Sequence, residues 1–128
     1  DAKKENGKYF VYNSKIRRLT ELLVSDFSKK VEDYGAGEIL INSVDRDGSG
    51  EGFDIELINL LEKNTNLPII ACGGAGDYHH FEEVYKKTDI DAVAAANFFQ
   101  YKDQSIYYTK KFLVEKNINV REPDLFEI

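Results

Sequence analysis

Three short apolar segments constrain the fold of this chain most strongly, because each is followed by a loop of small or acidic residues and then by an amphipathic segment. They are residues 38–44, 67–72 and 92–96. They lack a clean alternation of apolar and polar residues, which is typical of strands covered on both faces. The order strand, helix, strand, helix, strand, helix predicts an α/β fold with a parallel sheet and right-handed crossovers. In such folds the site lies at the carboxyl ends of the strands.

Helices are predicted wherever apolar residues recur at a spacing near 3.6. The segments with this pattern are residues 20–34, 55–64, 77–87 and 105–116. Thr20, Asp54 and Asp77 stand at positions where an N-cap is expected. In the first of these helices the apolar positions are expected to be Leu22, Leu23, Phe27, Val31 and Tyr34, and the Gly35-Ala36-Gly37 segment should end it.

The remaining segments are shorter. Residues 8–13 are aromatic and β-branched and follow the turn dipeptide Asn6-Gly7, so they are expected to form one arm of a hairpin. Residues 98–101 are expected to form a short turn, and residues 117–128 a tail. The chain starts at Asp1 and contains no Met. We therefore expect it to be a fragment or a processed half of a larger protein.

Composition excludes several classes of protein. The 128 residues carry 17 basic and 23 acidic side chains, a net charge of −6, so a nucleic-acid partner is not expected. No run approaches the ~18 apolar residues of a membrane span, so we expect no membrane association. The single cysteine, Cys72, excludes an internal disulfide and fits a reducing cytoplasm. We expect a folded cytoplasmic protein without a metal or a cofactor.

Three loops follow the three predicted strands and carry the strongest functional signal. They are residues 45–50, the glycine loop 73–76, and residues 95–97. Glycines let backbone N–H groups approach an anion closely, so three such loops at one edge would form a phosphate cradle without a lysine. The alternative is that the glycines only make tight turns.

Two segments contain residue types that can bind a metal ion, the acidic loop after the first apolar segment and the pair His79-His80. Six residues match positions one, three, five, six, seven and twelve of a calcium loop: Asp45, Asp47, Ser49, Gly50, Glu51 and Glu56. A strand precedes this loop instead of a helix, and Gly52 stands where an apolar residue is normal, so calcium binding is disfavoured. His79 and His80 are neighbours that would point about 100° apart on a helix, which does not suit ligation of one metal.

Two aspartates are candidates for acid–base chemistry. Asp1 would stand at a strand end, and Asp47 lies in the loop after the first apolar segment. A carboxyl group at the catalytic end of a barrel can transfer protons when burial lifts its pKa. Residue types alone leave the plainer interpretations open, in which Asp1 is a polar terminal residue and Asp47 forms a turn.

Several segments together resemble one family, the cyclase subunit of imidazole glycerol phosphate synthase in histidine biosynthesis. The resemblance runs from Asp1 to about Arg121. It is carried by Asp1-Ala2-Lys3, Gly35-Ala36-Gly37-Glu38-Ile39-Leu40, Asn42-Ser43-Val44-Asp45-Arg46-Asp47-Gly48, Gly52-Phe53-Asp54, residues 67–76, and Asn119-Val120-Arg121. It implies an eight-stranded (β/α)8 TIM barrel of ~250 residues, of which this chain would be the second half, βα units five to eight.

The resemblance also implies residue roles. Asp1 would be the general acid and Asp47 would lie beside it, while the partner aspartate would lie in the first half. Asn42 and Ser43 would face the site. Ammonia from a glutaminase subunit would enter near Glu38. The residues implied for one phosphate site of the bisphosphate substrate are Gly48, Gly73, Gly74, Ala96 and Asn97.

The implied activity is a lyase reaction: ammonia-dependent closure of the imidazole ring. Departures from the family pattern at Cys72, Asn97, Thr20-Glu21 and residues 13–18 keep one alternative open, a paralogue that supplies ammonia for amidination of surface sugars. A second alternative is a non-catalytic, phosphate-binding half-barrel, which glycine loops without the first-half aspartate would fit if the 128 residues were the whole molecule. In each case the 128-residue chain alone is expected to be inactive and to self-associate, because a half-barrel has open edges and an uncovered inner face.

Overall fold

The computed structural model describes residues 1–101 and 105–124, so the last four residues of the expected tail lie outside the described residues. No helix in these two ranges is long and apolar enough to cross a membrane. The strands are β1 (Ala2–Glu5), β2 (Lys8–Asn13), β3 (Arg18–Leu23), β4 (Ile39–Asn42), β5 (Ile69–Cys72) and β6 (Ala92–Ala94). The helices are α1 (Val24–Asp33), α2 (Ile55–Glu62), α3 (Tyr78–Lys87), α4 (Asn97–Tyr101) and α5 (Ser105–Glu115).

Strands β4, β5 and β6 form a parallel sheet in that order, which confirms the prediction from the three apolar segments. The register places Asn42 beside Cys72 and Cys72 beside Ala94. The carboxyl ends of all three strands are therefore level, and the three loops leave the sheet from the same edge. Each strand is shorter than its apolar segment by a few residues.

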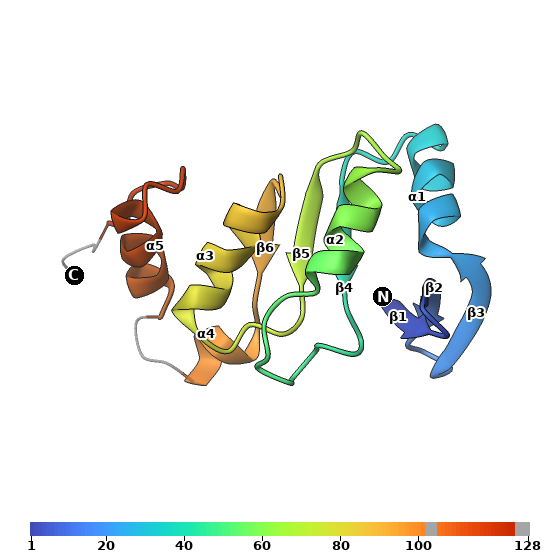
Figure 1. The fold of residues 1–128 in the computed structure, drawn as a ribbon, viewed down its shortest axis with the longest axis horizontal. Coiled ribbons are helices and arrows are strands. Elements are labelled where there is room, and N and C mark those ends of the chain that lie inside the picture. The colour runs from blue at the N-terminus through green and yellow to red at the C-terminus, as the bar shows by residue number, and fades with distance from the viewer. Residues whose placement is uncertain (102–104, 125–128) are drawn as a thin grey trace.

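The two faces of this sheet differ in burial. Ile41, Ile69 and Ala71 are buried in a core that includes residues of α2 and α3. Figure 1 shows these helices in front of the sheet, where they cover one of its faces. Leu40 points to the opposite face, since successive strand residues alternate, and its side chain is 58% exposed. That face is therefore open in this chain.

A second sheet, β1-β2-β3, is antiparallel and contains the predicted hairpin. Its two-residue turn is Asn6-Gly7, and both residues have positive φ, 50° and 76°, as the common hairpin turn requires. Ala2 also forms a parallel bridge with Ser43, and the N–H of Val44 donates to the carbonyl of Ala2 at 2.9 Å. The first residue of β1 therefore connects the antiparallel sheet to the end of β4 through one isolated β-bridge.

The predicted helix over residues 20–34 is wrong in its first turn. Strand β3 continues to Leu23, and α1 begins at Val24 without a side-chain cap. Thr20 is not an N-cap, because its Oγ1 donates to the carbonyl of Val11 on β2 at 2.7 Å. The backbone of this segment pairs with β2, and that partner is invisible in a local apolar pattern.

The inward face of α1 also differs from the prediction. The buried residues of the helix are Val24 and Ser28. Phe27 is 38% exposed and Tyr34 is 78% exposed, although the spacing placed both inward. The buried face of the helix therefore lies along Val24 and Ser28 and not along Phe27 and Tyr34. Its end is as predicted, because Asp33 is the last helical residue and Gly35 follows with φ +85°.

The other predicted helices are confirmed with small shifts of their ends. The carboxylate of Asp54 caps α2 by accepting from the N–H of Leu57 at 3.1 Å. Asp77 caps α3, and the backbone N–H of Asp77 donates to Nδ1 of His80 at 3.2 Å. The expected turn at residues 98–101 is the short helix α4. The two capped helices begin directly after the loops that carry the candidate site.

Candidate functional site

The three loops that follow β4, β5 and β6 meet around one pocket of about 260 Å³. This convergence confirms the expectation that they share one edge of the sheet. The lining residues are Asp47, Gly48 and Gly50 from the first loop, Cys72, Gly73, Gly74, Ala75 and Gly76 from the second, and Ala95, Ala96, Asn97, Phe98 and Tyr101 from the third. Within residues 1–101 and 105–124, no lysine or arginine lines this pocket.

Close backbone contact between the first two loops requires glycine. The N–H of Gly52 donates to the carbonyl of Gly74 at 2.8 Å. A Cβ on Gly74 would lie 2.1 Å from the carbonyl oxygen of Gly52, and one on Gly76 would lie 2.4 Å from that of Gly50. Two of the glycines therefore serve close packing of one loop against the other, in addition to any role in anion binding.

Asp47 lies at the edge of the pocket and is held mainly by backbone. Its N–H donates to the carbonyl of Ser43 at 2.9 Å, and the side-chain amide of Asn42 lies 3.5 Å from its Oδ2. The Oδ1 of Asn42 is buried without a hydrogen-bond partner among the described residues and points toward Gly73. Asn42 therefore lies between the first loop and the second but does not itself line the pocket.

Asp1 lies at a neighbouring position but not in the same pocket. Its carbonyl accepts from the N–H of Tyr12 at 2.9 Å, and its carboxylate accepts from the hydroxyl of Ser14. The bridge between Ala2 and Ser43 places it beside the carboxyl end of β4. Asp1 and Asp47 are both exposed. The described residues therefore do not bury these carboxyl groups, as was expected for residues that transfer protons.

The structure corrects the placement of Ser43. The family resemblance implies that both Asn42 and Ser43 face the site, but neighbouring strand residues point to opposite faces. Ser43 is 1% exposed, its Oγ donates to Oδ2 of Asp54 at 3.0 Å, and it does not line the pocket. Glu38 is exposed and precedes β4, so it lies at the amino ends of the strands, across the sheet from the loops.

The sequence did not predict the position of Cys72 in the pocket or the contact of Asp54 with Tyr9 nearby. The thiol of Cys72 lines the pocket, and burial is the main cause that raises its pKa above the usual value. Asp54 was identified only as a helix cap, but it also accepts a hydrogen bond of 2.8 Å from the hydroxyl of Tyr9. The adjacent Cys72-Gly73 pair could have signalled the first feature. No sequence pattern signals the second, because the partners are 45 residues apart.

Two carboxylates, one in the loop after β4 and one in the first turn of α2, contact the hairpin. Asp45 accepts from the backbone N–H of Lys4 at 2.7 Å, and Glu56 forms a 2.5 Å ion pair with the Lys4 ammonium. Glu56 lies in the first turn of α2, as expected, and not in a calcium loop. Within residues 1–101 and 105–124, no group of three or more His, Cys, Asp or Glu side chains is arranged to hold a metal ion.

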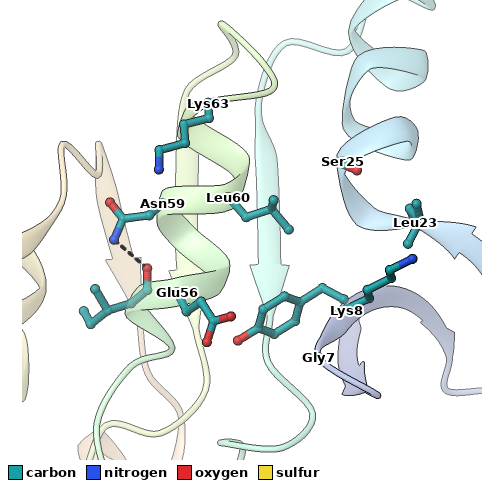
Figure 2. A pocket seen from close by; sticks show the side chains of 10 residues that line it. Gly7, Lys8, Leu23, Ser25, Glu56, Asn59, Leu60 and Lys63 are labelled. Atoms are coloured by element: carbon teal, nitrogen blue, oxygen red, sulfur yellow. Dashed lines mark hydrogen bonds between the residues drawn. The ribbon is translucent and has the colours of Figure 1, made fainter.

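A wider groove of about 920 Å³ lies on the outer side of the molecule, where α2 approaches the hairpin and the start of α1. Figure 2 shows Asn59, Leu60 and Lys63 of α2 on one side of it, and Leu23 and Ser25 on the other. It shares no lining residue with the glycine-loop pocket. The glycine-loop pocket, at the carboxyl ends of the parallel strands, is therefore the candidate site.

Comparison with known proteins gives one consistent family. A family model described as "Histidine biosynthesis protein" matches residues 1–105, and this family has the (β/α)8 TIM-barrel fold. The chain is 44% identical over 122 residues to the imidazole glycerol phosphate synthase subunit HisF of Hydrogenobaculum sp. (strain Y04AAS1). That match covers 94% of this chain and 48% of the relative.

Two further relatives bear the same name. The chain is 43% identical over 123 residues to the protein of Bacillus pumilus (strain SAFR-032), covering 94% of this chain and 49% of the relative. It is 44% identical over 119 residues to that of Pyrobaculum aerophilum, covering 92% and 47%. The chain thus spans about half the length of the curated relatives it matches.

Proposed function

We propose, from the premise that this chain belongs to the histidine biosynthesis protein family, that it forms the second half of an imidazole glycerol phosphate synthase cyclase barrel. Its relatives are about twice as long, and one face of its parallel sheet is open at Leu40, which supports the assignment to half of a barrel. The full-length protein would close the imidazole ring with ammonia. A ribulosyl bisphosphate substrate would yield imidazole glycerol phosphate and an aminoimidazole carboxamide ribotide.

The observation that carries this proposal is the meeting of three loops at one pocket. Backbone N–H groups of Gly48, Gly73, Gly74 and Asn97 would hold one phosphate of the substrate, with Ala96 completing the pocket wall. A bisphosphate substrate fixed in this way would lie across the carboxyl ends of the strands. The glycines would then have two roles, the close loop packing described above and access of the phosphate to the backbone.

The carboxylates would supply the proton chemistry. Asp1 would act as the general acid in ring closure, and Asp47, beside the pocket, would assist at the same edge. Both are exposed in this chain, so bound substrate and the other half of the barrel would have to exclude water from them. Asn42 would orient Asp47 through its side-chain amide.

We propose that ammonia comes from a glutaminase subunit bound at the opposite end of the strands. Glu38 precedes β4 and is exposed there, which suits a position at an ammonia entrance. The relatives bear the name of imidazole glycerol phosphate synthase, which favours this function over amidination of surface sugars. The non-catalytic alternative remains only for the 128-residue chain by itself.

Titration with inorganic phosphate, followed by NMR, tests the site. The amide resonances of Gly48, Gly74 and Asn97 should shift together, and that of Gly37, which precedes β4, should not. Turnover of the ribulosyl substrate by the full-length protein, with an ammonium salt as the nitrogen source, tests the reaction. Absence of both the shifts and the turnover would contradict the proposal.

A further inference from the structure

The carboxylate of Asp54 connects three separate segments of the chain. Its Oδ1 accepts from the hydroxyl of Tyr9 on β2 at 2.8 Å and from the N–H of Leu57 in α2 at 3.1 Å. Its Oδ2 accepts from the hydroxyl of Ser43, directly after β4, at 3.0 Å. One side chain thus joins the antiparallel sheet, the parallel sheet and a helix.

The joined segments carry the two candidate acid groups. Strand β2 pairs with β1, and the N–H of Tyr12 on β2 donates to the carbonyl of Asp1. On the other side, Asp54 ends the loop that contains Asp47 and Gly48. The same carboxylate therefore lies between the strand pair that holds Asp1 and the loop that holds Asp47.

The other side-chain contacts of the hairpin with this region are open to solvent. Asp45, which accepts from the backbone N–H of Lys4 at 2.7 Å, is exposed. The ion pair of Lys4 with Glu56 is open to solvent, because the side chains are 38% and 63% exposed, and such pairs contribute little. Tyr9 is 5% exposed as a whole residue and its bond to Asp54 is part-buried, so water competes for this bond less than for the ion pair. A hydrogen bond to a carboxylate is among the stronger single contacts in a protein. The bond between Tyr9 and Asp54 is therefore the main side-chain connection of the hairpin to the loop.

We propose that Tyr9 and Asp54 are positioning residues that fix the distance between Asp1 and Asp47. This inference rests on the proposed function. Neither residue lines the glycine-loop pocket or touches a reacting atom. Burial and the adjacent carboxylate raise the pKa of Tyr9, so its hydroxyl stays protonated and donates throughout the working pH range.

Substitution of Tyr9 by Phe in the full-length protein is the sharpest test, because the buried ring is kept and only the hydroxyl is lost. With ammonium as nitrogen source, kcat should fall about tenfold while KM for the substrate changes little. Tyr34→Phe is the matched control, since Tyr34 is 78% exposed and distant in the chain from the site. Asp54→Asn should have a larger effect, but it also weakens the cap of α2.

A second measurement does not depend on activity. Hydrogen exchange of the amides of residues 46–49 should become about tenfold faster in Tyr9→Phe, while exchange in β5 stays as in the parent. If Tyr9→Phe lowers only the melting temperature and leaves both kcat and this exchange unchanged, the positioning role is wrong. If the parent protein does not turn over the substrate, the proposed function fails, and the exchange result alone decides whether Tyr9 fixes the loop.

Discussion

Gly74 and Gly52 approach so closely that a side chain on Gly74 would occupy the position of the Gly52 carbonyl. The N–H of Gly52 and the carbonyl of Gly74 share a hydrogen bond of 2.8 Å, and a Cβ on Gly74 would lie 2.1 Å from the Gly52 oxygen. Gly74 also has φ +99°, which L side chains rarely adopt. A backbone hydrogen bond therefore holds the first two loops of the site close together.

Gly74→Ala should accordingly destabilise the protein and weaken phosphate binding. The positive φ alone costs about 1–3 kcal/mol, and relief of the clash must move the two loops apart. We expect a lower melting temperature and an increase of about fivefold to a hundredfold in the Kd for phosphate, since about 1.4 kcal/mol corresponds to a factor of ten. Gly37→Ala is the control, because a Cβ there meets open space. Equal melting temperatures for the two variants would contradict the packing argument.

Asp1→Asn in the full-length protein should abolish most ring closure and leave substrate binding in place. An amide is nearly isosteric with a carboxyl group but cannot transfer the proton, so kcat should fall by roughly 100- to 10,000-fold. Steady-state kinetics with an ammonium salt bypass the glutaminase and measure this step directly. Asp33→Asn, at the exposed end of α1, serves as the control. Near-normal turnover of Asp1→Asn would exclude Asp1 as the acid.

Glu82 connects α3 to α5 and should make stability depend on acid pH. Its carboxylate accepts from Lys86 at 2.5 Å, lies 3.7 Å from the ammonium of Lys116 on the segment after α5, and contacts His79. The hydrogen bond from Lys86 is the main cause that lowers the pKa of Glu82 below 4.5. A lowered folded-state pKa means that the stabilisation is present above pH 4.5 and is lost as the pH falls through the folded-state pKa.

Glu82→Gln should therefore lower the melting temperature near pH 7, and its effect should shrink as the pH falls through the folded-state pKa, because the parent carboxyl then becomes protonated as well. Thermal denaturation at a series of pH values measures the difference. The exposed Glu115 at the end of α5 provides the control substitution, Glu115→Gln. If Glu82→Gln lowers the melting temperature by the same amount at the high and the low end of the pH range, the charge of Glu82 is not involved.

The 128-residue chain by itself should self-associate. Leu40 is 58% exposed on the open face of the parallel sheet, and Phe27 of α1, which lines the same pocket of about 90 Å³, is 38% exposed. Sedimentation at micromolar concentration should show dimers or larger species, and Leu40→Asn should weaken them. Ile16→Asn removes an equally exposed apolar side chain, 59%, from the hairpin loop and should not. A monomer at these concentrations would contradict the prediction.

Sequence alone predicted the parts of the fold in which local pattern and tertiary structure agree. Continuous apolar runs predicted β4, β5 and β6, and Asp54 and Asp77 marked the starts of α2 and α3. The glycine-loop pocket followed from these elements, because the carboxyl ends of neighbouring parallel strands must meet at one edge. The family resemblance was needed for Asp1, which no local pattern distinguishes from a polar terminal residue.

The errors arose where a distant partner decides the structure. Residues 18–23 have the spacing of a helix, yet their backbone pairs with β2, and such pairing depends on context more than on propensity. Ser43 was placed in the site with its neighbour Asn42, although a strand sends the two side chains to opposite faces. The contact of Tyr9 with Asp54 spans 45 residues and has no local signal.

The antiparallel ribbon β1-β2-β3 pairs with the parallel sheet at one of its ends. Its inter-strand bonds run within β1, β2 and β3, and among the described residues only Ala2 forms a β-bridge outside the ribbon, to Ser43. The Asn6-Gly7 tip is exposed, so extra residues inserted there would lengthen the ribbon into solvent and leave the register at Ser43 unaltered. The tip is therefore a place where an epitope or a fluorophore could be grafted, and where length could drift during evolution, without disturbing the barrel strands.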